Sequence, residues 1–397
     1  MNDEPVDWVN FAAYHWGKGP VVLPGGRSVD PQRVHEVITA ASAPFHAGTR
    51  VRAMPDVRFL TTRGRLPAPG SLLPTPADGD TESYLARLRT ELPAEGALLT
   101  VRHPLLIDFG LWSRVRELLA GLWQQVGWPA VPVAAELTVG ERYVRTSGAP
   151  GPAGAAHLTW VLTGAMTVRV WQDPDREWSE FAVRAGELMY LPDGYRFADQ
   201  YGDGVTTLRI TVPARQTAAL ATVQDLLAER AQRQPEFAAG PAFLPFPAPT
   251  APDGSVRSAE PLPATARLVG QLAHGPELER TLRNRWAARR SAAGLEPVPP
   301  PRAARDLGPG QRFRVTAEIF RMADGPGSAV WAINGHLLPV AGAAGERIPA
   351  ALPPGRETTV DDLARVLEVP PDSEGLRALT RALYRTRAIE PLEGAAP

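Results

Sequence analysis

A series of short alternating segments between residues 158 and 212 most constrains the fold of this chain. Apolar and polar side chains alternate over residues 158–163 and 206–212, which is the period that puts successive side chains on opposite faces of a β-strand. Gly164 and the pair Asp193-Gly194 mark tight turns between such segments. Short strands separated by turns at about ten-residue spacing predict an antiparallel barrel or jelly roll.

Helical patterns lie on both sides of this region. Apolar residues at helical spacing predict a helix over 111–126, and similar stripes predict helices over 220–227 and from 278 to 286. Near the end of the chain, strand-like residues in 312–338 precede two helices, the first opened by a Thr359-x-x-Asp362 cap. Small strands beside a few helices predict a winged-helix-like module.

Stretches rich in proline and glycine divide the chain. Residues 66–80 are expected to form a surface loop, residues 235–263 a linker or wrapping arm, and residues 297–310 a further connection. We therefore expect a jelly-roll domain over 1–213, a helical segment over 214–295 and a winged-helix-like domain over 296–397. The predicted fold class is mainly β plus α.

Composition removes several classes of chemistry. The absence of cysteine excludes disulfides, thiolate metal sites and cysteine nucleophiles. The ligands of any metal site would have to come from the seven histidines and the carboxylates. Lys plus Arg is 42 against 43 for Asp plus Glu, so we do not expect binding to nucleic acid or to an anionic membrane through bulk charge. No apolar run reaches about 18 residues, and the start, Met1-Asn2-Asp3-Glu4, is unlike a signal peptide. These features predict a soluble, cytoplasmic protein without a membrane partner.

Three motifs resemble one family. Residues 11–20 (Phe-Ala-Ala-Tyr-His-Trp-Gly-Lys-Gly-Pro), the hairpin over 158–171 and residues 186–194 (Gly-Glu-Leu-Met-Tyr-Leu-Pro-Asp-Gly) resemble segments of ribosomal-oxygenase-type JmjC proteins, which are cupin-fold hydroxylases. The order of the predicted parts is similar too. The resemblance implies a JmjC-like double-stranded β-helix, a helical dimerisation segment and a winged-helix-like C-terminal domain.

The same resemblance implies a metal and a co-substrate. Members of that family use Fe(II), held by a His-x-Asp pair and a second histidine, together with 2-oxoglutarate held by a lysine. The positions that match these residues are Gly151, Ala153 and Phe197 for the metal ligands and Met166 for the lysine. Because glycine, alanine and phenylalanine offer no side-chain donor to iron, the resemblance indicates a degenerate member with no bound cofactor. We expect Phe197, Met166 and Met189 to fill the former pocket.

His157 is the one histidine near the matched metal motif. It is a candidate for substrate binding or for an unusual metal site. The alternative, which we favour, is a hydrogen-bonded strand histidine.

Arginines are candidates for a carboxylate-binding site. Arg145, Arg169 and Arg209 lie within the predicted barrel, and arginine binds carboxylates through two parallel hydrogen bonds. Arg209 is the best of the three because it lies on the last barrel strand, whereas Arg169 is offset from Met166 by an odd number of residues and faces away. The alternative for all three is a surface or rim position.

Other charged groups have ordinary interpretations. Asp193, Asp199 and Asp203, with Tyr195 between them, form a candidate site for a cation or a basic peptide, although two Asp-Gly pairs favour turn chemistry. Arginine-rich stretches over 280–290 and 377–387 are expected to be solvated helix faces rather than nucleic-acid contacts.

Two functions remain open. The first is a non-catalytic JmjC-like protein that binds a peptide or protein partner, for example in bacterial peptide modification, as a homodimer through the helical segment, with candidate substrate-binding residues His157, Arg209, Arg145 and Tyr195. The second is an active Fe(II)/2-oxoglutarate hydroxylase with displaced ligands, which would need His157 with Asp199 or Asp203, and Arg209 for the co-substrate. Metal-free catalysis in the barrel is a third possibility, for which no nucleophile–base pair is present.

Overall fold

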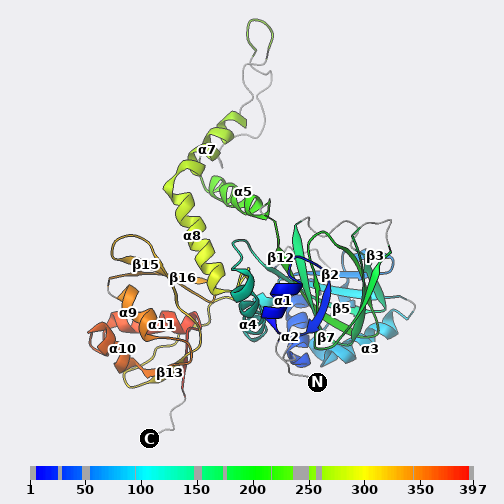
Figure 1. The fold of residues 1–397 in the computed structure, drawn as a ribbon, viewed down its shortest axis with the longest axis horizontal. Coiled ribbons are helices and arrows are strands. Elements are labelled where there is room, and N and C mark those ends of the chain that lie inside the picture. The colour runs from blue at the N-terminus through cyan, green and yellow to red at the C-terminus, as the bar shows by residue number, and fades with distance from the viewer. Residues whose placement is uncertain are drawn as a thin grey trace. The chain divides into compact units, whose positions relative to one another are not determined.

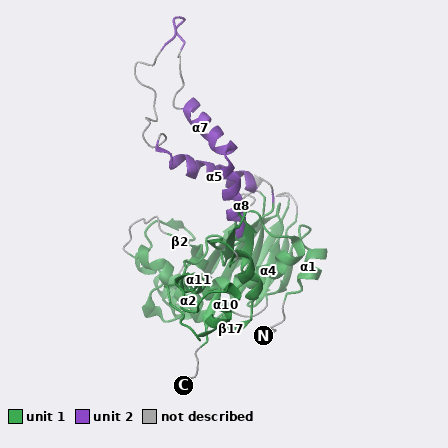
Figure 2. Ribbon diagram, turned by 90° about the vertical axis from the view of Figure 1, so that its left-hand side faces the viewer, with its two compact units in different colours: residues 1–214, 288–397 green, residues 215–287 purple. Residues whose placement is uncertain are grey.

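The computed structural model describes residues 6–25, 29–46, 54–93, 95–146, 154–172, 177–215, 217–235, 250–255, 262–342 and 344–392. The chain falls into two compact units, residues 1–214 with 288–397 and residues 215–287, coloured green and purple in Figure 2. Among the helices that the structure describes, none combines the length and apolar character needed to cross a bilayer.

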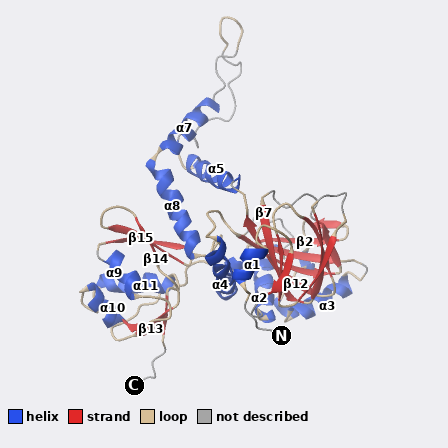
Figure 3. Cartoon of the chain, viewed as in Figure 1, coloured by secondary structure: helices blue, strands red, loops and turns tan. Residues whose placement is uncertain are grey.

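Two antiparallel sheets surround a common interior in the first part of the larger unit (Figures 1 and 3). The eight-stranded sheet consists, in order, of β1 (Val21–Pro24), β10 (Glu187–Leu191), β7 (Ala155–Thr163), β12 (Val205–Pro213), β5 (Ala134–Glu141), β4 (Ala97–Arg102), β2 (Asp56–Thr61) and β3 (Gly64–Leu66). The four-stranded sheet consists of β6 (Tyr143–Thr146), β11 (Arg196–Tyr201), β8 (Ala165–Trp171) and β9 (Ser179–Arg184). This arrangement confirms the predicted jelly-roll class.

The eight-stranded sheet separates two apolar cores. Along β7, Leu158 and Trp160 belong to an outer core covered by helices, whereas Val161 belongs to the inner core that contacts the four-stranded sheet. The outer core also contains buried residues of α1 (Trp8–Tyr14), α2 (Pro31–Ser42), α3 (Thr81–Glu91) and α4 (Phe109–Val126). The short helices η1 (Ala43–Phe45) and η4 (Pro104–Leu106) contribute one residue each. Leu111 and Leu119 of α4 are fully buried, which confirms the helix predicted over 111–126.

The turn between β7 and β8 requires glycine. Gly164 has a φ of +74°, and a Cβ atom there would lie 2.8 Å from the carbonyl oxygen of Gly204. Both the backbone angle and the space exclude a side chain. The turn therefore determines which residues of β7 and β8 point into the barrel.

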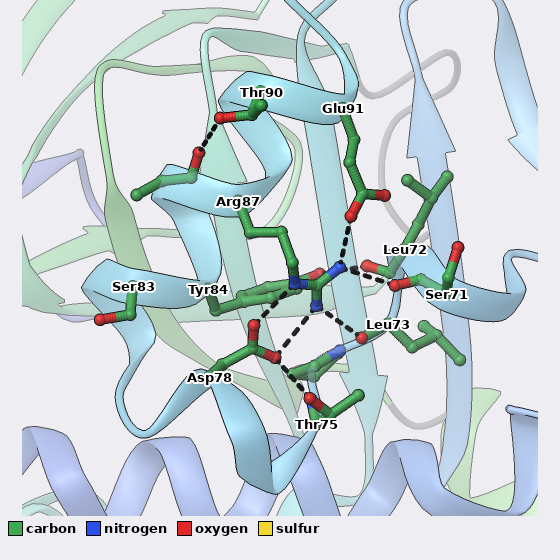
Figure 4. A network of polar contacts seen from close by, with 12 residues as sticks. Ser71, Leu72, Leu73, Thr75, Asp78, Ser83, Tyr84, Arg87, Thr90 and Glu91 are labelled. Atoms are coloured by element: carbon green, nitrogen blue, oxygen red, sulfur yellow. Dashed lines mark hydrogen bonds and ion pairs between the residues drawn. The ribbon is translucent and has the colours of Figure 1, made fainter.

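Residues 66–80 are anchored to α3 by one arginine (Figure 4). The guanidinium of Arg87 donates to both carboxylate oxygens of Asp78, at 2.7 and 3.0 Å, and to the carbonyl oxygens of Ser71 and Leu73. The segment contains η2 (Gly70–Leu72) and η3 (Pro76–Asp78), and the side chain of Leu73 is fully buried. Most of the segment is exposed or half-buried and lies outside α-helices, as expected for a surface loop. Its proline and glycine content does not reveal the arginine that orders it.

The smaller unit is helical. It contains α5 (Thr217–Gln232), α7 (Leu262–His274) and most of α8 (Pro276–Ser291). Leu226 is buried, whereas Leu220 and Leu262 are exposed by 59% and 71%. Most of the predicted linker over 235–263 lies outside the described residues.

The last part of the larger unit combines two three-stranded sheets with three helices around a core of its own. The strands are β13 (Arg312–Val315), β17 (Glu357–Thr359) and β18 (Ile389–Pro391), and β14 (Phe320–Ala323), β15 (Ser328–Ile333) and β16 (His336–Ala341). The helices are α9 (Ala344–Ala351), α10 (Val360–Leu367) and α11 (Glu374–Arg385). At the start of α10, the amide of Asp362 donates to Thr359 Oγ1 and the amide of Thr359 donates to the Asp362 carboxylate, which confirms the predicted cap. The winged-helix-like character of this part stays a prediction.

Candidate functional site

The barrel interior has an apolar part that surrounds the position matched to the family's second histidine. Phe197, Met166 and Met189 are exposed by 5%, 3% and 0%, and they belong to one cluster of buried side chains. The cluster further contains Leu98, Val161, Val168, Val170, Val183, Leu191, Tyr201 and Val205. Side chains packed in this way remove apolar surface from water and stabilise the barrel by about 1.5–3 kcal/mol for each large residue.

A buried ion pair lies beside this apolar cluster. Arg209 on β12 donates from Nη2 to Asp199 Oδ2 on β11 at 2.7 Å, and its Nε donates to Thr159 Oγ1 on β7 at 2.9 Å. The side chains of Arg209 and Asp199 are exposed by only 6% and 0%. The guanidinium carbon also lies 4.6 Å from the ring centre of Phe197. Arg209 therefore links three strands through the barrel interior.

This geometry corrects two expectations. Asp199 does not belong to a turn, because it lies within β11 and is fully buried. The surface or rim position considered for Arg209 is likewise wrong. Arg169, by contrast, is exposed and pairs with Glu180 at 2.9 Å, as its offset from Met166 predicts.

A second ion pair lies nearer to solvent. Arg145 on β6 contacts Glu136 on β5 at 2.5 Å, and their side chains are exposed by 34% and 19%. Arg145 is the cross-strand neighbour of Asp199, so both project to the same face of the four-stranded sheet. Burial opposes the charge of Arg145, but Glu136, Tyr201 and Asp199 together outweigh it and the pKa of Arg145 is raised.

His157 lies close enough to Arg209 and Arg145 to be affected by their charges. Its Nδ1 is 3.3 Å from Thr211 Oγ1, and its ring packs edge-on against Phe197 with centroids 5.5 Å apart. The pKa of His157 is lowered to about 3 by burial and by the positive charges of Arg209 and Arg145, against attraction by Asp193. The histidine is therefore neutral at physiological pH.

The remaining candidate residues are more peripheral. Tyr195 follows β10 and packs, partly buried, against the inner core. Gly151 and Ala153, matched to the first two metal ligands, lie outside the described residues. The structure thus brings together His157, Arg209 and Phe197, whereas Tyr195 is placed only against the inner core.

Sequence reasoning missed the partners of these candidates. Glu136 is the cross-strand neighbour of Arg209, and Thr159 is its neighbour on the other side. Asp199 follows Phe197 by two residues, so strand alternation places both on the inner face. That spacing was a usable signal for Asp199, whereas the pairing of β12 with β5 is not visible in the sequence.

The residues present do not fit an Fe(II) and 2-oxoglutarate site. Within the described ranges, no group of three histidine, aspartate or glutamate side chains is placed to hold a metal ion. Glycine, alanine and phenylalanine at 151, 153 and 197 supply no side-chain ligand, whatever their placement. Met166 carries no charge for a carboxylate, and Arg209 is already paired.

Comparison with known proteins supports the fold. No family model and no curated protein matches the sequence. Among solved structures, YcfD from Escherichia coli is similar at 13% identity and a TM-score of 0.50, over 97% of this chain and 98% of that one. A second structure, described as YcfD, a ribosomal oxygenase, matches at 13% identity and a TM-score of 0.47, over 98% of this chain and 100% of that one. A third, YcfD in complex with cobalt and 2-oxoglutarate, matches at 14% identity and a TM-score of 0.49, over 98% of both chains.

Proposed function

We propose that this chain is a non-catalytic member of its fold that binds a peptide or protein segment at the mouth of the barrel. The fold is that of the ribosomal oxygenase YcfD along nearly the whole length of the chain, as the resemblance of the sequence motifs implied. The observation that carries the proposal is the paired Arg209. The charge of this guanidinium is already neutralised by the buried Asp199 carboxylate, so it offers no unpaired positive charge to an acidic co-substrate.

The mouth of the barrel retains groups suited to a peptide. Arg145 and Glu136 are partly exposed and of opposite charge. The aromatic ring of Tyr195 is partly buried against the inner core. Paired charges recognise polar side chains and chain ends, while an aromatic group contributes buried area. The cobalt and 2-oxoglutarate of the YcfD complex belong to that protein, and we do not assign them to this chain.

We further propose a homodimer formed through the helical residues 215–287. Leu220 and Leu262 are exposed on helices of this unit, and Trp286 is exposed by 38%. A second copy of the same surface would cover these apolar groups. A monomeric mass in light scattering would contradict the dimer.

Selection from a displayed peptide library tests binding at the mouth. We expect enriched peptides to lose about tenfold in affinity when Arg145 is replaced by alanine, which corresponds to about 1.4 kcal/mol. Arg169→Ala is the matched control, because Arg169 is an exposed arginine of the same sheet that faces away from the interior. Failure to enrich any peptide, or equal losses in the two variants, would overturn the proposal.

A further inference from the structure

The buried pair of Arg209 and Asp199 resembles a carboxylate-binding site with its carboxylate bound. Arg209 is held from three directions, by its own strand β12, by the hydroxyl of Thr159 on β7 and by the ring of Phe197 on β11. Its guanidinium is thereby fixed before any acid approaches it. Preorganised donors in a water-poor interior bind carboxylates much more strongly than exposed ones do.

The carboxylate in this site belongs to the chain itself. Asp199 Oδ2 accepts from Arg209 at 2.7 Å, while Asp199 Oδ1 is buried with no hydrogen-bond donor among the described residues. The position of Asp199 on β11 leaves Oδ1 without a donor, whereas a free acid could rotate in the site to engage both of its oxygens. The pair therefore balances the charge of Arg209, as a bound acid would, but leaves one carboxylate oxygen without a hydrogen bond.

Arg145 differs from Arg209 in this respect. Its side chain is exposed by 34%, and that of its partner Glu136 by 19%. Exposed pairs of this kind discriminate weakly between anions, because water competes for them.

We propose that Arg209 is a small-carboxylate site and that Asp199 is the tethered acid that occupies it and excludes free acids from the barrel. This inference rests on the proposed function, and it names Asp199 as the residue that keeps an acidic ligand out of the interior. Replacing Asp199 with alanine removes one carboxylate group and leaves space for a free acid of the same size, which is formate. Longer acids fit less well, since the neighbouring inner core is packed.

Thermal unfolding of the full-length Asp199→Ala variant tests this inference. In sodium chloride we expect a melting temperature several degrees below that of the wild type, because a buried arginine has lost its partner. Sodium formate at the same ionic strength should restore much of the loss in a saturable way. The wild type should respond equally to the two salts.

Two variants isolate the cause. Asp199→Asn fills the same volume without a charge and should not respond to formate, and Asp199→Ala combined with Arg209→Met should not respond because the guanidinium is gone. If Asp199→Ala does not fold in chloride, the yield of soluble protein refolded in formate against chloride gives the same comparison.

The inference would be overturned if formate stabilised Asp199→Ala and the double variant equally. It would also be overturned if formate raised neither the melting temperature nor the refolding yield of Asp199→Ala. Stabilisation of the wild type by formate that is lost in Arg209→Met would also overturn it, since the site would then be open. Failure of the peptide selection would leave these results unchanged, so the two proposals fail separately.

Discussion

Replacing Arg209 with methionine is expected to lower the free energy of unfolding by about 3–5 kcal/mol at neutral pH. The substitution leaves the fully buried Asp199 carboxylate without its 2.7 Å partner, and water cannot reach it to compensate. Urea denaturation followed by tryptophan fluorescence measures this loss.

Two comparisons separate the ion pair from general damage to the sheet. Arg169→Met removes an exposed pair with Glu180 and should change stability by less than about 1 kcal/mol. The double variant Arg209→Met with Asp199→Leu replaces both charges by apolar groups and should recover most of the loss. If Arg209→Met costs no more than Arg169→Met, the pair does not hold the barrel together as described.

A titration of stability below neutral pH should show the second large effect, which comes from His157. Its pKa is lowered from 6.5 to about 3 in the folded chain, so the unfolded chain binds the proton more readily. The stability that depends on neutral His157 is therefore complete above about pH 6.5 and is lost as the pH falls toward 3. At about 1.4 kcal/mol per pH unit, roughly 2–3 kcal/mol should be lost between about pH 6.5 and 4.5.

The variant His157→Asn removes this titration while its amide nitrogen can take the place of Nδ1 beside Thr211. We expect the wild type and the variant to have parallel stability curves above about pH 7, and the wild type to fall more steeply below it. Curves that stay parallel down to about pH 4 would show that His157 is not held neutral by its surroundings.

The strands of the barrel could be predicted from the sequence because each is specified locally. Alternation over 158–163 and the turn at Gly164 both depend on neighbouring residues, as does the Thr359–Asp362 cap. The partners of Arg209 could not be predicted in the same way. They come from β7 and β11, and which strands enclose an interior follows from the folded sheet order rather than from any local pattern.

Asp199 shows where a local signal was available and misleading. It lies between two Asp-Gly turns, at 193–194 and 203–204, but it is followed by Gln200 and belongs to a strand. Residue type favoured a turn, whereas the two-residue spacing from Phe197 favoured the inner face. Spacing was the better guide, because strand geometry determines direction and composition does not.

We propose that internal packing and an internal ion pair have replaced, in this chain, the iron and 2-oxoglutarate sites that its resemblance to JmjC hydroxylases implies. The most direct test is metal analysis of the full chain purified with Fe(II) under nitrogen, together with measurement of succinate formed from 2-oxoglutarate on admission of oxygen. We expect no stoichiometric iron and no succinate above that of the protein-free mixture. Stoichiometric iron that is lost in His157→Asn, accompanied by succinate release from the wild type, would contradict it and establish a hydroxylase with displaced ligands.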